Sequence, residues 1–533
     1  GFAFALMMLS ASCGKEKPRI SMIDPKFVVA GQNLTIMGEG FGDEQGESFV
    51  TIGGVNPTLS SYLEWSDTKI VVRTPDFGES GLIYVHRQDQ KSNPVLVSTL
   101  GSMPESPETQ TGYAPVIKQI RPASASIGQL IVIQGSGFGS EKNESSVFFS
   151  WAAERQSPAP ARAKETQLIE ASGYAGAYEA WNDHEIHVRT PDGAASGGVQ
   201  VVTQRGKSNA AAFELNAKPG IKSIQDKRTY SVSYSVDIQA QNAEPPNSMY
   251  VLCPVPPSTA AQLNKDIIAG SSKPFVDDYN GAALFRLTGL KSGDNRRISV
   301  SYLVDVYGVE TDIDPGLVKT DANLSAPEDW KLASSLVPSD DAEIRELAAK
   351  FTERETNPYL KALAIYNGIL AEFTVRHGMA PVSVQQALSE KRLDPYTAAV
   401  LYCALCRAAG IPAVIVSGVL CSKTGSAPPH YWVEFWVDGF GAVPVDVALG
   451  AGAAAESFKL RDDHESYYFG NMDNQHLIFS YGESVFSKID ARGRTASREL
   501  NYALQNIWEE ASGNIEAYSS YWSDINITGI YSN

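Results

Sequence analysis

The sequence lacks an apolar run long enough to cross a membrane and lacks any block of basic residues. Its N-terminal apolar run extends only from Phe2 to Leu9, whereas a membrane-spanning helix needs about 20 residues. The 44 lysines and arginines are outnumbered by 61 aspartates and glutamates, which gives a net charge of −17. An acidic chain without basic clusters suits neither nucleic acid nor anionic membrane surfaces, so we expect neither as a partner.

Cysteine is also scarce, with five in 533 residues. Cys403 and Cys406 form a C-x-x-C inside an apolar helical run, and no second such pair or histidine pair lies nearby. Asp473 and His476 in the sequence DNQH are two ligand types on an irregular segment, too few for a metal site. A chain of this length does not need a disulfide framework. We therefore predict buried thiols, no metal site and no cofactor.

The first residues, GFAFALMMLSASCGKEKP, contain an apolar run, three small residues and then Cys13. This order resembles the end of a lipoprotein signal peptide, with residues 1–13 as its remnant. The resemblance implies lipidation of Cys13 and a cell-envelope location, with the outer membrane and the cell surface as the expected site. Acyl chains would then be the only membrane attachment. The alternative is an ordinary signal peptide fragment in which the cysteine stands by chance.

A repeated pattern fills the N-terminal half of the chain. The first copy reads AGQNLTIMGEGFG and then WSDTKIVVRTPD, and the second reads IGQLIVIQGSGFG and then WNDHEIHVRTPD. The copies are offset by 97 residues at Gly40 and Gly137 but by 116 at Trp65 and Trp181. The second copy therefore carries a 19-residue insertion between these points.

Short alternating stretches separated by Gly, Pro and Asn predict antiparallel β-sandwiches in both copies. The G-x-G-F-G and I-x-V-R-T-P-D motifs resemble the IPT/TIG domain, an immunoglobulin-like fold, over residues 17–100 and 115–216. We interpret Trp65 and Trp181 as core residues rather than exposed sugar platforms. A third stretch, residues 219–315, alternates apolar and polar residues without a chemical motif and is expected to form another sandwich.

From about Ala326 helical patterns precede strand patterns, which is typical of an α+β domain extending to residue 533. The stretch PYTAAVLYCALCRAAG predicts a helix with Asp394 as N-cap, Pro395 at its first position and Gly410 at its C-terminal cap. The strands PAVIVSGVL, HYWVEFWV and GAVPVDVA follow it. The predicted class is three immunoglobulin-like sandwiches in tandem, followed by an α+β domain.

The segments ALCRAAGIPAVIVSG, HYWVEFWVDGFGAVPVD and YYFGNMDNQH make residues 326–533 resemble transglutaminase-like (papain-type) domains. This resemblance implies a Cys-His-Asp triad, with His430 and Asp446 as two of its members. In that family the nucleophilic cysteine opens the central helix. Counting back from Gly410 places Pro395 at this position, and proline cannot act as a nucleophile.

Other cysteines are weak substitutes for the missing nucleophile. Cys403 and Cys406 lie roughly 12 and 16 Å along the helix from its start, at ~1.5 Å rise per residue. Cys421 ends the strand before His430 and would approach it if the two strands form a hairpin. It would nevertheless lack the helix N-terminus that stabilises a thiolate.

Alternation along a strand places His430, Trp432 and Glu434 on one face. Together with Asp446 they predict a cleft that binds a sugar or a peptide through stacking and polar contacts. The alternative for His430 is a purely structural pair with Asp446, kept because the pair suits the fold.

The leading hypothesis is a lipid-anchored surface protein whose transglutaminase-like domain is catalytically inactive and serves in ligand binding or scaffolding. Arrays of sandwiches carrying a distal domain resemble surface glycan-binding lipoproteins of polysaccharide-utilising bacteria. This implies a polysaccharide or peptide ligand, with outer-membrane proteins as partners. One alternative is an active cysteine-type peptidase, amidase or acyl transferase that uses Cys421. The other is a purely structural envelope protein.

Overall fold

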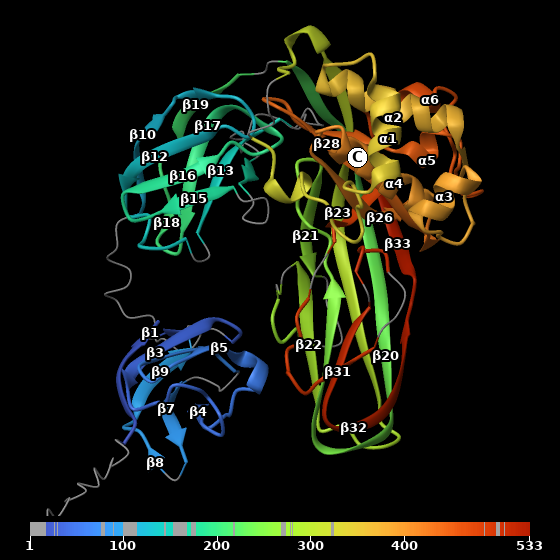
Figure 1. The fold of residues 1–533 in the computed structure, drawn as a ribbon. Coiled ribbons are helices and arrows are strands. Elements are labelled where there is room, and N and C mark those ends of the chain that lie inside the picture. Colours follow the sequence, from blue (N-terminus) through green and yellow to red (C-terminus); the bar gives the residue numbers. More distant parts are fainter. Residues whose placement is uncertain are drawn as a thin grey trace, which may run out of the picture.

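The computed structural model (Figure 1) describes residues 17–532 apart from a set of shorter segments. The segments left out are residues 26, 29, 76–79, 89, 100–113, 143–144, 153–167, 172–176, 217–218, 268–272, 278, 280, 321–324, 484–485, 497–500 and 506. The predicted lipidation site Cys13 and the signal-peptide remnant 1–13 lie outside the described residues. In the part of the chain that is described, every helix is too short or too polar to cross a membrane.

Two β-sandwiches form the N-terminal half of the chain (Figure 1). The strands of the first are β1 (Arg19–Asp24), β2 (Phe27–Val28), β3 (Asn33–Glu39), β4 (Phe49–Ile52), β5 (Tyr62–Trp65), β6 (Lys69–Arg73), β7 (Ser80–Arg87), β8 (Gln90–Lys91) and β9 (Val95–Thr99). Those of the second are β10 (Val116–Arg121), β11 (Ser124–Ala125), β12 (Leu130–Ser136), β13 (Ser146–Trp151), β14 (Leu168–Glu170), β15 (Tyr178–Trp181), β16 (Glu185–Arg189), β17 (Ala194–Thr203), β18 (Gly206–Lys207) and β19 (Ala211–Leu215).

The repeat in the sequence corresponds to a repeat in strand order. The sheets β1-β3-β6-β5 and β2-β9-β7-β4 of the first sandwich match β10-β12-β16-β15 and β11-β19-β17-β13 of the second. Among the strands of the described residues, β14 alone has no counterpart, and it lies within the inserted segment. Trp65 and Trp181 each donate the indole N–H to the backbone oxygen of the G-F-G phenylalanine, at 3.2 and 3.1 Å. Both rings pack against their apolar cores, as predicted.

The motif glycines serve close strand pairing. A Cβ placed on Gly38 would stand 2.0 Å from the carbonyl oxygen of Arg19, and one on Gly135 would stand 2.0 Å from that of Val116. Any larger residue would therefore separate β1 from β3, or β10 from β12.

The third sandwich is built on one long strand, β20, and is drawn as the elongated lower-right body in Figure 1. Its strands are β20 (Gly220–Pro254), β21 (Gln262–Ile267), β22 (Ala282–Thr288), β23 (Asn295–Ile313), β31 (Arg494–Thr495), β32 (Trp508–Trp522) and β33 (Ile525–Ser532). The sheet order is β21-β23-β20-β32-β31, and β22 and β33 also pair with β20.

The C-terminal strands correct the predicted boundaries. Strand β32 pairs with residues 236–252 of β20, and β33 pairs with residues 228–233. The sandwich predicted at residues 219–315 therefore also includes the last strands of the chain. The predicted domain 326–533 is correspondingly shorter, because β32 and β33 belong to the sandwich. A strand as long as β20 would otherwise leave one edge of backbone N–H and C=O groups unpaired.

The α+β domain between these segments has a four-stranded sheet covered by helices (Figure 1). Its helices are α1 (Ala342–Thr352), α2 (Pro358–Glu372), α3 (Val384–Glu390), α4 (Pro395–Ala408), α5 (Val447–Gly450) and α6 (His464–Tyr467). Its strands are β24 (Thr374–Val375), β25 (Arg392–Leu393), β26 (Ala413–Leu420), β28 (Pro429–Val437), β29 (Gly441–Val445) and β30 (His476–Tyr481), with the sheet order β29-β28-β26-β30. The short strand β27 (Gly425–Ala427), between β26 and β28, pairs instead with β33 of the third sandwich.

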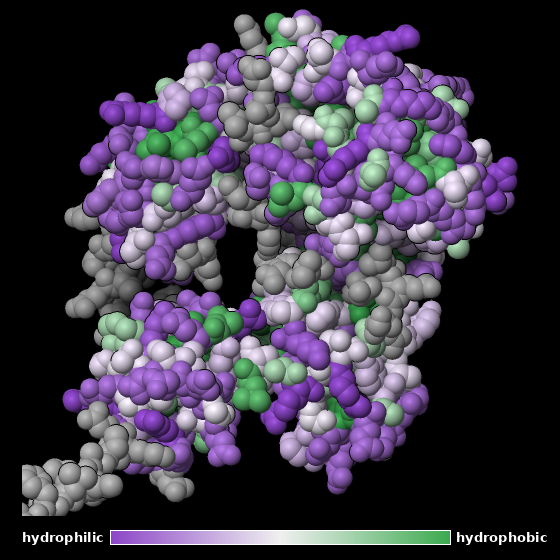
Figure 2. Space-filling model, in the orientation of Figure 1, coloured by the Kyte–Doolittle hydropathy of each residue, from purple (hydrophilic) through white to green (hydrophobic). Residues whose placement is uncertain are grey.

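Helix α4 is the centre of this domain. All of its residues from Thr397 to Cys406 are buried, and it contacts α1, α2, α3, α5 and the strands β26 and β28. The surface around it is polar. On the face drawn in Figure 2, apolar side chains form separate small patches within a mostly hydrophilic surface.

Candidate functional site

Helix α4 begins as the sequence predicted. The Asp394 carboxylate accepts the backbone N–H groups of Tyr396 and Thr397 at 2.9 and 3.2 Å. Pro395 is the first helical residue, where no N–H donor is needed, and Gly410 follows the C-cap with φ +79°. Pro395 is also the position at which the family resemblance predicts the cysteine, and its side chain has neither a thiol nor a hydroxyl.

The predicted partners His430 and Asp446 are brought together. His430 lies near the start of β28 and is 1% exposed, while Asp446 follows β29 and is fully buried. The Nε2 atom of His430 is 2.6 Å from Oδ2 of Asp446. The other carboxylate oxygen accepts the N–H of Leu449 at 2.8 Å, so Asp446 also caps α5.

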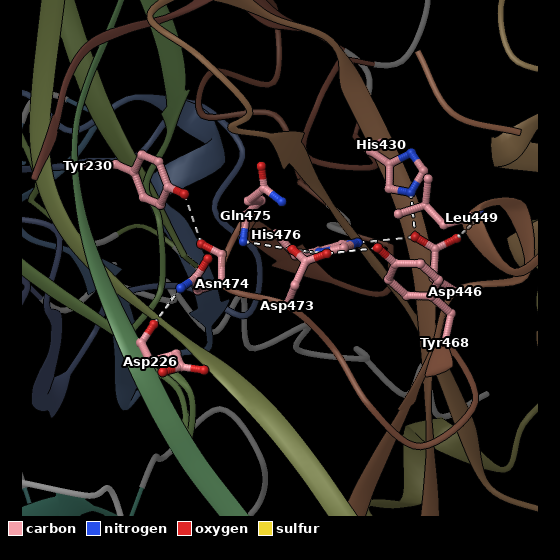
Figure 3. Close-up of polar contacts among 10 residues, drawn as sticks. All are labelled: Asp226, Tyr230, His430, Asp446, Leu449, Tyr468, Asp473, Asn474, Gln475 and His476. Atoms are coloured by element: carbon pink, nitrogen blue, oxygen red, sulfur yellow. Dashed lines mark hydrogen bonds and ion pairs between the residues drawn. The ribbon is translucent and has the colours of Figure 1, made fainter. Parts of the chain in front are cut away.

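A second imidazole, from His476, completes this cluster (Figure 3). His476 opens β30, is 3% exposed and places Nε2 3.1 Å from the same Oδ2 of Asp446. Its Nδ1 lies 3.1 Å from Oδ1 of Asp473. Tyr468 and Gln475 donate to the Asp473 carboxylate, each at 2.8 Å. Sequence spacing relates His476 only to Asp473 and gives no sign of its contact with Asp446.

The third sandwich holds the segment that carries His476. The hydroxyl of Tyr230 on β20 donates to the backbone oxygen of Asn474 at 2.9 Å. The side-chain amide of Asn474 donates in turn to the backbone oxygen of Asp226. Figure 3 shows this line of contacts running from β20 to the imidazole cluster. The cluster is therefore built jointly by the sandwich and the α+β domain.

The hydrogen-bond partners determine where the protons lie. A carboxylate oxygen only accepts, so both Nε2 atoms that face Asp446 carry hydrogen. Burial alone lowers the pKa of His476, but Asp473 and Asp446 outweigh it and raise that pKa to about 9. Burial alone raises the pKa of the Asp446 carboxyl, yet the imidazoles of His430 and His476 hold it well below its ordinary range. His476 is thus an imidazolium at neutral pH.

His430 keeps an unused acceptor. Its Nδ1 atom is buried and has no hydrogen-bond partner among the described residues. With hydrogen on Nε2, this nitrogen carries the lone pair. In triads of this kind, the ring nitrogen opposite the carboxylate takes the proton of the nucleophile.

Trp432 lies on the same side of β28 as His430, as predicted from alternation. The two rings stack with centroids 6.2 Å apart, and the ring of His476 meets Trp432 edge-on at 5.1 Å. Trp432 is only 2% exposed and packs against Val416 and Leu420. Its role as a ligand platform stays a prediction, because the ring is enclosed in this structure.

Glu434 makes a different contact. Its Oε1 atom accepts the hydroxyl of Tyr481 at 3.3 Å. Burial raises the pKa of Glu434 from its ordinary 4.5 to about 7, and the charge of Asp192 adds to this shift. Asp192 is paired with Lys222 at 2.6 Å, and Lys222 also donates to the backbone oxygen of Ala442. Glu434 thus lies where the second sandwich, β20 and the sheet of the α+β domain meet.

Cys421 does not join the His-Asp pair. The hairpin itself is present, since β26 and β28 are antiparallel with Gly418 opposite His430. However, Cys421 packs with Val419 and the core of the third sandwich, whereas Trp432 packs in the apolar cluster on the other side. Burial raises the pKa of the Cys421 thiol far above its ordinary value. The remaining described cysteines are buried as well.

A pocket of ≈ 480 Å³ lies between α2 and α6. The exposed Asn367 and Asp463 provide polar groups, whereas the aromatic Tyr366 and Phe469 beside them are only 1% and 8% exposed. Burial raises the pKa of Tyr366, and the charge of Asp446 contributes next. This pocket has the size and the mixed lining that small ligands use.

Comparison with known families finds the two predicted kinds of domain. Residues 345–447 match the transglutaminase-like superfamily, and residues 18–98 and 115–152 match the IPT/TIG domain. The chain therefore contains a transglutaminase-like domain and IPT/TIG domains.

Individual proteins resemble this chain only distantly. A cyclomaltodextrin glucanotransferase of Bacillus sp. (strain 1-1) is 39% identical over 59 residues, which are 11% of this chain and 8% of that enzyme. A candidate cysteine protease from Cytophaga hutchinsonii has a TM-score of 0.37 and 16% identity, over 59% of this chain and 92% of its own. SGBP-B from a xyloglucan utilization locus in Bacteroides uniformis has a TM-score of 0.18 and 10% identity, over 55% and 99%. With TM-scores this low, neither structure supports a conclusion about function.

We predict a pH-dependent gain in stability for Glu434→Gln. The raised pKa means that Glu434 stabilises the folded state fully below pH 4.5 and that this contribution is lost as the pH rises towards 7. Glutamine cannot ionise, so the variant should unfold like the natural protein near pH 4.5. At pH 8 it should be more stable by on the order of 2 kcal/mol.

Urea unfolding followed by tryptophan fluorescence at both pH values measures this difference. The exposed Glu456→Gln is the matched control and should change neither curve. An equal pH dependence of stability in the natural protein and in Glu434→Gln would contradict the assignment.

Proposed function

We propose that this protein is a non-catalytic binding or scaffolding protein of the cell envelope, built on a transglutaminase-like domain that has lost its nucleophile. The observation that carries the proposal is Pro395 at the first position of α4. Cysteine catalysis needs a thiolate, and a helix N-terminus beside an imidazole is what favours one. This chain retains the helix start and the imidazole of His430 without the thiol.

The described cysteines offer no replacement. Burial raises the pKa of Cys403 to about 11 and raises those of Cys253, Cys406 and Cys421 further above the ordinary thiol value. A thiol of this kind is almost wholly protonated at neutral pH and is a poor nucleophile. The competing function, a peptidase, amidase or acyl transferase using Cys421, therefore lacks both proximity to His430 and activation.

We propose a glycan as the ligand class. Support comes from the tandem β-sandwiches of the chain and from the pocket beside α2, where the exposed Asn367 and Asp463 offer polar groups. Side-chain hydrogen bonds in a pocket of this kind suit sugars. A purely structural envelope protein is the remaining alternative and would need neither feature.

We predict that none of the four described native thiols reacts quickly. In the full chain at pH 7, iodoacetamide should modify the four described cysteines slowly, because their thiols are buried and protonated. In Pro395→Cys the introduced thiol should react at least about tenfold faster, because the start of α4 and His430 favour its thiolate. Peptide mass spectrometry over time gives both rates.

Combining Pro395→Cys with His430→Ala is the control, and the introduced thiol should then slow down. Rapid modification of Cys421 in the natural sequence, lost on His430→Ala, would instead establish a displaced nucleophile and overturn the non-catalytic proposal.

We predict glycan binding by the full chain. Electrophoresis through gels containing single soluble polysaccharides should retard the protein on at least one of them. Asn367→Ala should weaken that retardation by removing a pocket hydrogen bond, and Trp65→Phe in the first sandwich is the control. Trp432→Phe keeps most of the buried apolar volume. Weaker retardation of this variant would indicate that the predicted cleft takes part in binding. Unchanged migration across a broad polysaccharide panel would rule out the glycan and leave the scaffolding role.

We propose that acyl chains on Cys13 anchor the protein at the cell surface, with outer-membrane proteins as partners. In cells making the protein with its complete signal peptide, labelled palmitate should enter the natural protein but not Cys13→Ala. Protease added to intact cells should degrade the anchored form. Absence of label from the natural protein would dismiss the anchor without affecting the proposed binding role.

A further inference from the structure

We propose that His430, Asp446 and His476 form a binding site for one divalent transition-metal ion, with zinc as the ion that fits best. The three donor atoms lie within 4.8 Å of one another, and all three residues are buried. This assignment does not depend on the proposed glycan role. It replaces the expectation from sequence, in which His476 had only Asp473 beside it.

The three donors converge from separate, well-supported elements. His430 comes from β28, Asp446 from the end of β29 and His476 from the start of β30. Both Nε2 atoms point at the same carboxylate oxygen, as Figure 3 shows. Ligands that lie in or directly beside strands of one sheet have little freedom to move apart.

The donor set suits zinc. Two imidazoles and one carboxylate are the ligand types of a three-ligand zinc site, in which the fourth position stays open. Zinc–nitrogen bonds near 2.0–2.1 Å place tetrahedral ligands about 3.3 Å apart. The His476–Asp446 separation of 3.1 Å is already close to this value, while the His430–Asp446 separation of 2.6 Å would have to widen.

The surroundings supply the outer contacts that metal sites need. A ligating histidine usually donates its other N–H to a carboxylate, and His476 Nδ1 faces Asp473 at 3.1 Å. Tyr468 and Gln475 orient Asp473, and the N–H of Leu449 holds the second oxygen of Asp446. These contacts fix both residues before an ion binds.

Charge balance favours a divalent ion. Asp446 and Asp473 bring two carboxylates into an almost fully buried cluster. With both imidazoles neutral, one ion of charge +2 neutralises that pair. Binding forms bonds to the two Nε2 atoms and to Oδ2 of Asp446. The imidazolium of His476 releases one proton to solvent, and His430 moves its hydrogen from Nε2 to the unpaired Nδ1.

The test uses the full chain with zinc or cobalt as the probe. Because the donors are buried, the ion is supplied during expression and again to chelator-treated protein. We expect one equivalent of zinc by elemental analysis and, with cobalt, the visible absorption of a four-coordinate centre. His476→Gln should lower the affinity at least 100-fold, and Asp473→Asn should lower it 10- to 100-fold.

His184→Gln is the matched control, because this exposed histidine beside Asp183 lies in the second sandwich. Circular dichroism without metal establishes that each variant is folded. Asp473→Asn leaves all three ligands in place and decides the question if His476→Gln fails to fold. Less than about 0.1 equivalent of bound zinc, or equal affinity in the natural protein and in Asp473→Asn, would overturn the site and leave a hydrogen-bonded cluster only.

Discussion

The buried carboxylate of Asp446 is the constraint on which the centre of this molecule depends. A carboxylate removed from water costs several kcal/mol unless its oxygens are bonded. Asp446 meets this requirement with two imidazoles on one oxygen and a backbone N–H on the other. These bonds fix the positions of β28, β30 and α5 relative to β29. The cluster therefore holds these elements together whether or not it has a further role.

The cluster around Asp446 also depends on contacts with the third sandwich. Strand β20 holds the segment around Asn474 through Tyr230, and the last strands of the chain complete the sheet around β20. The transglutaminase-like domain is therefore inserted into the third sandwich rather than added after it. The cluster at Asp446 is therefore held in place by contacts from both the third sandwich and the α+β domain.

Local patterns in the sequence were sufficient to predict several features of the α+β domain. Cap chemistry at Asp394 and Pro395 located the start of α4, and strand alternation put Trp432 beside His430. The same signals could not indicate that Trp432 is enclosed, because enclosure depends on Tyr468 and Ile478, which arrive from a distant segment. They also missed His476 as a partner of Asp446, since thirty residues separate the two and neither motif spacing nor periodicity links them.

The sequence by itself determined the repeated sandwiches, the α+β domain and the capped start of its central helix. Each of these follows from short-range sequence patterns, such as strand alternation and helix capping. Only the tertiary structure decided that the chain's end completes the third sandwich, that Cys421 faces away from His430, and that two imidazoles share one carboxylate. These outcomes depend on which distant segments satisfy unpaired edges and buried charges, and that choice is made only when the whole chain packs.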